Sequence, residues 1–138
     1  GIAFGGETGF LVGAVSGFVS NFFVGQGPWT PWQMFAMGII GFLAGVLFKK
    51  GCLRRTRASL AVFGAFTAVI IYGGIMNPAA AMMMSSETLK WETILACYVT
   101  GLPMDLIHGF GTVIFLMIAA EPMLEKMDRI KVKYGIAD

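Results

Sequence analysis

Two ionisable side chains lie inside an apolar stretch of this sequence and are the first candidates for chemistry. Asp105 and His108 belong to segment 103–109, and His108 is the one histidine of the chain. Their spacing predicts that they share a helical face, and such groups are costly in apolar surroundings unless they are paired or hydrated. Three interpretations stay open: a structural pair in which Asp105 accepts from His108 or from backbone N–H groups freed by Pro103, a polar contact at the floor of a solute pocket, or a proton relay.

Neither metal chemistry nor nucleophilic catalysis is indicated around this pair. Two ligands are too few for a closed zinc site, and Cys52 and Cys97 do not form a CxxC motif. No serine has a GxSxG setting, and no GxxxxGK[ST] motif is present. We therefore expect no metal, no cofactor and no ATP hydrolysis on this chain. An intramembrane enzyme that uses Asp105 and His108 remains an alternative, although it would need a third catalytic group.

A second concentration of polar and aromatic groups is segment 25–33, with the sequence GQGPWTPWQ. Its prolines fix two φ angles and its glycines allow a sharp reversal, so we expect a hairpin of definite shape. Its flat indole faces and its amide and hydroxyl groups could orient a ligand. Tryptophan also concentrates at membrane surfaces, so the segment could instead be an interfacial anchor, and both roles can coexist. The candidate ligand contacts here are Gln26, Trp29, Thr30, Trp32 and Gln33.

The composition places these residues in a membrane protein. The chain is 57% hydrophobic and 13% charged, whereas an ordinary soluble domain has about 25% charged residues. We expect an all-α fold, a polytopic membrane helical bundle that forms a single transmembrane domain over residues 1–138. Its four spans should cover about residues 4–24, 32–48, 58–76 and 103–120, followed by a charged helical tail at 121–138.

Two parts of this pattern leave alternatives. The third span should close at Asn77-Pro78, with residues 79–90 as a second, Met-rich loop. The last apolar stretch begins near residue 92, so Pro103 either kinks one long helix or separates a short outer helix from the crossing.

Glycines recur at helical spacing in the first two spans. Residues four apart lie on one helical face, and small residues there let another helix approach closely. We expect helix packing at Gly9, Gly13, Gly17, Gly38, Gly41 and Gly45. A structural or assembly subunit that uses these glycine faces to stabilise other membrane helices is therefore a second functional alternative.

The basic residues predict the orientation. Five lie between the second and third spans, four lie in the tail, and only Lys90 falls on the other side. The positive-inside rule places the basic side in the cytoplasm. We therefore expect a multi-pass protein of the cytoplasmic membrane, with both ends of this chain cytoplasmic and segment 25–33 and the Met-rich loop external. Those two loops either cover an outward-facing pocket or are ordinary connections.

Several segments together resemble one family. Segment 25–34, Asn21-Phe22-Phe23, the stretch 105–108 and the tail 129–135 resemble the substrate-binding (S) components of energy-coupling factor (ECF) transporters, and the resemblance covers essentially the whole chain. It implies a six-helix fold, of which the spans here would be the last four and the first two would be absent. It also implies a vitamin ligand, a transmembrane coupling subunit and two cytoplasmic ATPases as partners.

The resemblance further implies how the protein works. A vitamin-like solute would be captured between segment 25–33, the loop after the third span and the outer part of the fourth. It would be released when the coupling subunit, driven by ATP hydrolysis elsewhere, tips the S component. The expected contacts, beyond those in segment 25–33, are Asn21, Asn77 and Trp91, with Asp105 and His108 deeper. Segment 25–33 looks most like that of cobalamin-type and riboflavin-like members, which favours a corrinoid first and riboflavin second.

Overall fold

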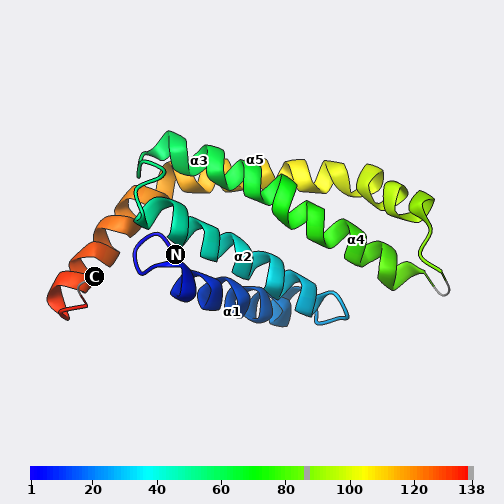
Figure 1. The fold of residues 1–138 in the computed structure, drawn as a ribbon, viewed down its shortest axis with the longest axis horizontal. Helices are drawn as coiled ribbons and strands as arrows, with labels where there is room; N and C mark the ends of the chain where they lie inside the picture. Colours follow the sequence, from blue (N-terminus) through cyan, green and yellow to red (C-terminus); the bar gives the residue numbers. More distant parts are fainter. Residues whose placement is uncertain (86–87, 137–138) are drawn as a thin grey trace.

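The computed structural model describes residues 1–85 and 88–136, in which the regular elements are all helices, joined by short connections. The elements are α1 (Gly6–Val24), α2 (Thr30–Lys49), α3 (Arg57–Phe66), the π-helix η1 (Thr67–Tyr72), α4 (Gly73–Met84) and α5 (Trp91–Lys133). Because α3, η1 and α4 follow one another without a break, they form one continuous rod (Figure 1). In the described part of the chain, four helical segments are long and apolar enough to cross a membrane. The predicted all-α membrane fold is thus confirmed.

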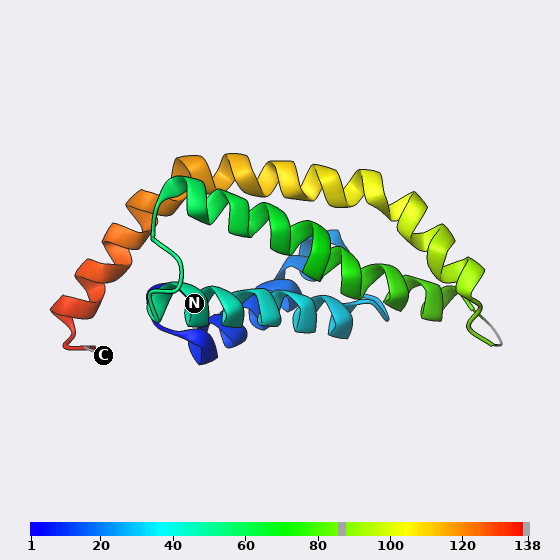
Figure 2. The ribbon, with the colours of Figure 1, turned by 45° about the horizontal axis from the view of Figure 1, so that its top comes forward.

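The helices pack as two antiparallel pairs. The first pair is α1 with α2, and the second is the rod of α3, η1 and α4 with α5 (Figures 1 and 2). The pairs meet where α2 packs against η1 and α4. The polar residues of η1 and α4 therefore lie at the junction between the two pairs.

Glycine contacts explain how closely α1 and α2 approach. A Cβ atom added to Gly9 would collide with the carbonyl oxygen of Gly41, and one added to Gly13 would collide with that of Met37. At Gly45 the same atom would collide with the backbone of α1 at Gly6. These glycines therefore bring α1 and α2 into backbone contact with each other. The faces of α1 and α2 that carry them are covered by the partner helix within this pair.

The third span is longer than the sequence pattern predicts. The expectation that it closes at Asn77-Pro78 is wrong, and so is the predicted loop over residues 79–84, because α4 continues through Pro78 to Met84. Residues 86–87 of the predicted loop lie outside the described residues. A proline inside a helix leaves the carbonyl four residues earlier without its N–H partner. That carbonyl belongs to Gly74, and it accepts a hydrogen bond of 3.2 Å from the Tyr98 hydroxyl of α5. A tertiary hydrogen bond thus replaces the one that proline removes.

The fourth span is a single long helix, which decides between the two alternatives left open by Pro103. Helix α5 contains Pro103 and Pro122 and includes most of the charged tail. It bows over the rest of the molecule in Figure 2, and internal prolines are the usual cause of such bends.

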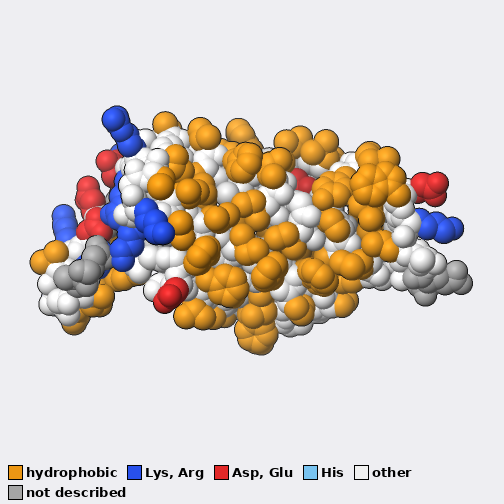
Figure 3. Space-filling model, in the orientation of Figure 1, with side chains coloured by type: hydrophobic (Ala, Val, Ile, Leu, Met, Phe, Trp, Pro, Cys, Tyr) orange, Lys and Arg blue, Asp and Glu red, His pale blue; other side chains and the backbone are white. Residues whose placement is uncertain are grey.

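Charged residues gather at the ends of the molecule, while apolar side chains cover its middle (Figure 3). Most basic side chains lie at the end that carries the α2–α3 connection and the C-terminal part of α5. There Arg57 forms an ion pair with Glu121, and Arg55 lies 3.7 Å from Asp128. These pairs tie the connection to α5 above a small core of Phe48, Leu60 and Ala120.

Candidate functional site

Three polar side chains at the turn between α1 and α2 form a closed hydrogen-bond network, which we call the turn brace: Asn21, Gln26 and Thr30. Asn21 donates from Nδ2 to the Thr30 hydroxyl over 3.0 Å, and that hydroxyl donates to Gln26 Oε1 over 3.0 Å. The hydroxyl also accepts from the Gly27 N–H, and Gln26 Nε2 donates to the Phe18 carbonyl. Asn21 and Thr30 are buried. These hydrogen bonds join the two ends of the turn and fix its shape.

The tryptophans near this turn are partly exposed. The Trp29 ring lies over Gly27, where a side chain would overlap it, and α2 begins at the next residue. Thr30, Trp32 and Gln33 therefore lie in the first turn of α2, not in a hairpin loop as predicted. Trp91 begins α5 and is 74% exposed. Its position is about 25 Å along α5 from His108, at a rise of about 1.5 Å per residue, so these two expected contacts lie far apart.

A second group, which we call the polar cluster, joins four elements: Gln33 from α2, Tyr72 from η1, Asn77 from α4, and Asp105 and His108 from α5. Its centre is a buried pair in which Asn77 Nδ2 donates to Asp105 Oδ2 over 2.8 Å. The expectation that Asp105 accepts from His108 or from the backbone at Pro103 is wrong, because its partner comes from another helix.

Two glycines make room for this buried pair. A Cβ atom on Gly73 would lie 2.5 Å from Asp105 Oδ2, and one on Gly101 would collide with Asn77 Oδ1. Both positions face the partner helix, so each helix contributes one polar side chain and one glycine. This arrangement lets α4 and α5 bury an amide and a carboxylate in direct contact. Burying either group without a hydrogen-bond partner would cost free energy.

Tyr72 connects the pair to the other members of the polar cluster. Its ring packs edge-to-face on His108, with ring centroids 5.6 Å apart and an interplanar angle of 89°. The Gln33 side chain is also among the groups that interact with its hydroxyl. In contrast, Gln33 Oε1 is buried and, within the described residues, has no hydrogen-bond partner. A buried acceptor left unpaired costs stability, so Gln33 Oε1 is a candidate for a ligand contact.

The π-helix places Tyr72 in this position. Thr67 donates its hydroxyl to the carbonyls of Phe63 and Gly64 at 2.8 and 3.2 Å, and η1 begins at Thr67. Short π-helical segments occur often at functional sites. Tyr72 was missed by the sequence analysis. The available signal was a tyrosine inside an apolar run directly before Gly73-Gly74.

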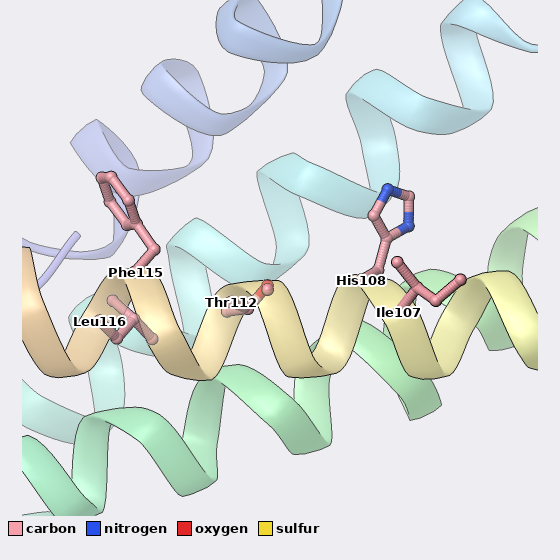
Figure 4. Close-up of a pocket in the computed structure, with 6 residues that line it drawn as sticks. Ile107, His108, Thr112, Phe115 and Leu116 are labelled. Carbon is pink, nitrogen blue, oxygen red and sulfur yellow. The ribbon is translucent and has the colours of Figure 1, made fainter.

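An open cavity of about 460 Å³ adjoins the polar cluster at His108. It is lined by residues of α5, and His108, Thr112 and Phe115 project from the same side of that helix (Figure 4). Ligand pockets in proteins span roughly 300–1,000 Å³ and are mostly apolar with a few fixed polar groups. The cavity and the polar cluster together have this character. Among the described residues, no group of three or more His, Cys, Asp or Glu side chains could hold a metal ion.

Comparison with protein-family models found one match. The model described as "ECF-type riboflavin transporter, S component" matches residues 1–124. This range includes the turn brace, the polar cluster and the cavity beside His108. Neither the comparison with curated proteins nor the one with solved structures found a match.

Proposed function

Because this chain belongs to the family of ECF-type riboflavin transporter S components, a family of membrane-embedded, non-enzymatic subunits that bind a vitamin for uptake, we propose that its own ligand is riboflavin. The polar cluster and the adjoining cavity form the binding site in this proposal. The observation that carries it is Gln33 Oε1, a buried acceptor that has no hydrogen-bond partner among the described residues.

The chemistry of riboflavin suits these side chains. Its ring system is flat, with an apolar edge at one end and an imide at the other that has one N–H donor between two carbonyl acceptors. Gln33 Oε1 would accept from the imide N–H, and the rings of Tyr72 and His108 would contact the flat face. The Asn77–Asp105 pair would hold α4 and α5 at the right separation. Trp29 and Trp32, which are partly exposed at the same end of α2, would cover the entrance.

The remaining parts of the mechanism follow from the same proposal. The vitamin enters from the external side, where the α1–α2 turn lies if the basic end is cytoplasmic. A transmembrane coupling subunit and two cytoplasmic ATPases are the partners that supply the energy for release. A corrinoid, which the sequence of segment 25–33 favours, is the second ligand to test.

Riboflavin fluorescence provides a direct test. Purified protein in detergent is titrated against riboflavin, cobalamin, thiamine, biotin and folate, with binding read from fluorescence quenching and from the rise in Tm. We expect a specific response to riboflavin. If none of these compounds raises Tm in a folded preparation, the proposal is wrong; if only cobalamin does, the ligand is a corrinoid.

A matched pair of variants tests the location. Tyr72→Phe removes the hydroxyl that contacts Gln33, whereas Tyr98→Phe removes the one that bonds to the Gly74 carbonyl. Each change deletes one hydroxyl from a partly exposed tyrosine of the same helix pair. We expect Tyr72→Phe to weaken riboflavin binding by several fold and Tyr98→Phe to lower stability while binding is retained. Equal loss of binding would place the site elsewhere.

A further inference from the structure

A second cavity, of about 520 Å³, lies between α2 and α3 and extends from Leu53 in the basic α2–α3 connection to Ile71 of η1. We call it the basic groove. Its walls are apolar and include Leu43 and Leu47 from α2, Leu53 from the connection, and Val62, Phe63 and Phe66 from α3. Within the described residues, α2 packs against η1 and α4 but its backbone does not approach that of α3. The two helices therefore leave an open apolar trough next to the α2–α3 connection.

Large apolar side chains in the wall of the basic groove are exposed. Val62 is 70% exposed and Phe66 is 58% exposed, although both belong to a segment that is apolar enough to span a membrane. Phe63 packs edge-to-face on Phe48, with ring centroids 5.3 Å apart, which supports the groove at its base. A trough of this kind in a membrane-spanning protein accommodates hydrocarbon chains.

The charges beside the basic groove fall into two classes. Arg55 and Arg57 are used within the protein, in ion pairs with Asp128 and Glu121. Lys50 and Arg54 flank the same connection and are exposed. In the described part of the chain, neither of these two side chains has a hydrogen-bond or ion-pair partner. Arg54 directly follows Leu53 of the groove wall, so the backbone that carries this basic residue lies at the end of the apolar trough.

We propose that the basic groove binds one anionic phospholipid, with an acyl chain between α2 and α3 and its phosphate at Lys50 and Arg54. Basic pockets between transmembrane helices favour anionic headgroups, and each nearby Lys or Arg strengthens the attraction. The apolar walls and the two unpaired cations are separate observations. An amphipathic molecule would contact both, the walls with its acyl chain and the cations with its phosphate. This proposal is independent of which vitamin the polar cluster binds.

Native mass spectrometry of the purified protein tests the proposal. The protein is equilibrated in mixed micelles with equal amounts of phosphatidylglycerol and phosphatidylcholine of the same acyl length, and Tm is measured with each lipid and with inorganic phosphate alone. We expect one phosphatidylglycerol to be retained preferentially and to raise Tm, with no effect of free phosphate. Equal retention of the two lipids, no retained lipid, or the same shift from free phosphate would each overturn the proposal, and none of these readings requires a variant.

Three variants locate the bound lipid. Lys50→Gln/Arg54→Gln should weaken phosphatidylglycerol binding about 30-fold, from two headgroup contacts. Lys126→Gln/Arg129→Gln makes the same charge change on the exposed face of α5 and should change binding less than about threefold. Val62→Trp leaves the charges in place but fills the trough, and it should reduce retention of both lipids. If the α5 pair of changes weakens binding as much as the Lys50 and Arg54 pair, the attraction is diffuse and the site proposal is wrong.

Discussion

The turn brace and the polar cluster are built from the same kinds of residue but differ in how completely their hydrogen bonds are satisfied. In the turn brace, the Thr30 hydroxyl donates once and accepts twice, and both polar atoms of the Gln26 amide have partners. In the polar cluster, Asn77 and Asp105 satisfy each other, but Gln33 Oε1 does not have a partner among the described residues. Both regions lie at the same end of α2, so depth in the membrane does not account for the difference.

This difference separates two roles that look alike in the sequence. The Thr30 hydroxyl already makes three hydrogen bonds inside the turn brace, so it has little left to offer a ligand, and its contribution is to the shape of the turn. The polar cluster has an unpaired acceptor at Gln33, and another of its members, His108, lines a cavity, so it has capacity to bind a ligand. We therefore interpret the turn brace as the support of the entrance and the polar cluster as the binding surface. The sequence analysis had placed most of the candidate ligand contacts in segment 25–33.

The largest effect is expected from breaking the buried pair. Asp105→Ala leaves the Asn77 amide buried without its acceptor and opens space beside Gly73. The free energy of unfolding should fall by about 3 kcal/mol, and riboflavin binding should be lost with it. Denaturant unfolding in mixed micelles measures the stability. Asp105→Asn keeps the size and one acceptor oxygen, so it should cost about 1 kcal/mol. Equal losses for the two variants would show that the charge, not the pair, is what matters.

The turn brace should respond in stability but not in affinity. Thr30→Val keeps the side-chain shape and removes the hydroxyl shared by Asn21, Gln26 and the Gly27 N–H. We expect a loss of about 2 kcal/mol in the free energy of unfolding, because the buried Asn21 amide and the part-buried Gly27 N–H both lose a partner. Riboflavin affinity of the folded protein, measured by fluorescence titration, should change little.

Thr100→Val provides the matched control for that change. The Thr100 hydroxyl bonds only to carbonyls of its own helix, at Ala96 and Cys97, so its loss should leave stability nearly unaffected. If Thr30→Val instead abolishes binding at full stability, the turn brace contacts the ligand and the contrast between the two regions fails.

Gln33 should show the opposite behaviour to Thr30. Gln33→Leu removes a buried acceptor that has no partner among the described residues, so stability should stay within about 1 kcal/mol of the parent. Riboflavin affinity should fall about tenfold, the equivalent of one hydrogen bond of about 1.4 kcal/mol. Isothermal titration measures the affinity. Unchanged affinity together with a clear loss of stability would make Gln33 a structural residue.

The sequence was sufficient for the helices but not for the partners of their polar groups. Apolar run length gives the number of spans, and glycine spacing indicates a packing face, because both are local properties of the chain. The continuation of α4 through Pro78 depends on the Tyr98 hydroxyl of α5, and the Asn77–Asp105 pair also joins two helices. Such contacts depend on the register between helices, which local periodicity does not encode.

Tyr72 illustrates the same limit within the site. Its role depends on a π-helical segment that begins at Thr67, and a change from α-helical to π-helical winding rotates the residues that follow. In the sequence, this segment is only an apolar run with a tyrosine near its end. Gln33 and His108 were identified as candidates from their chemistry, but the residue that links them was not.

The smallest effect is expected at His108, where it distinguishes an aromatic from a polar role. His108→Phe keeps a ring for the edge-to-face contact with Tyr72, whereas His108→Ala removes it. Aromatic pairs contribute about 0.5–1.5 kcal/mol beyond burial, so the alanine variant should weaken riboflavin binding by about threefold to tenfold. The phenylalanine variant should remain close to the parent in the same fluorescence titration. If the two substitutions weaken binding equally, a ring nitrogen contacts the ligand or carries a proton, and the unsatisfied part of the polar cluster extends from Gln33 to His108.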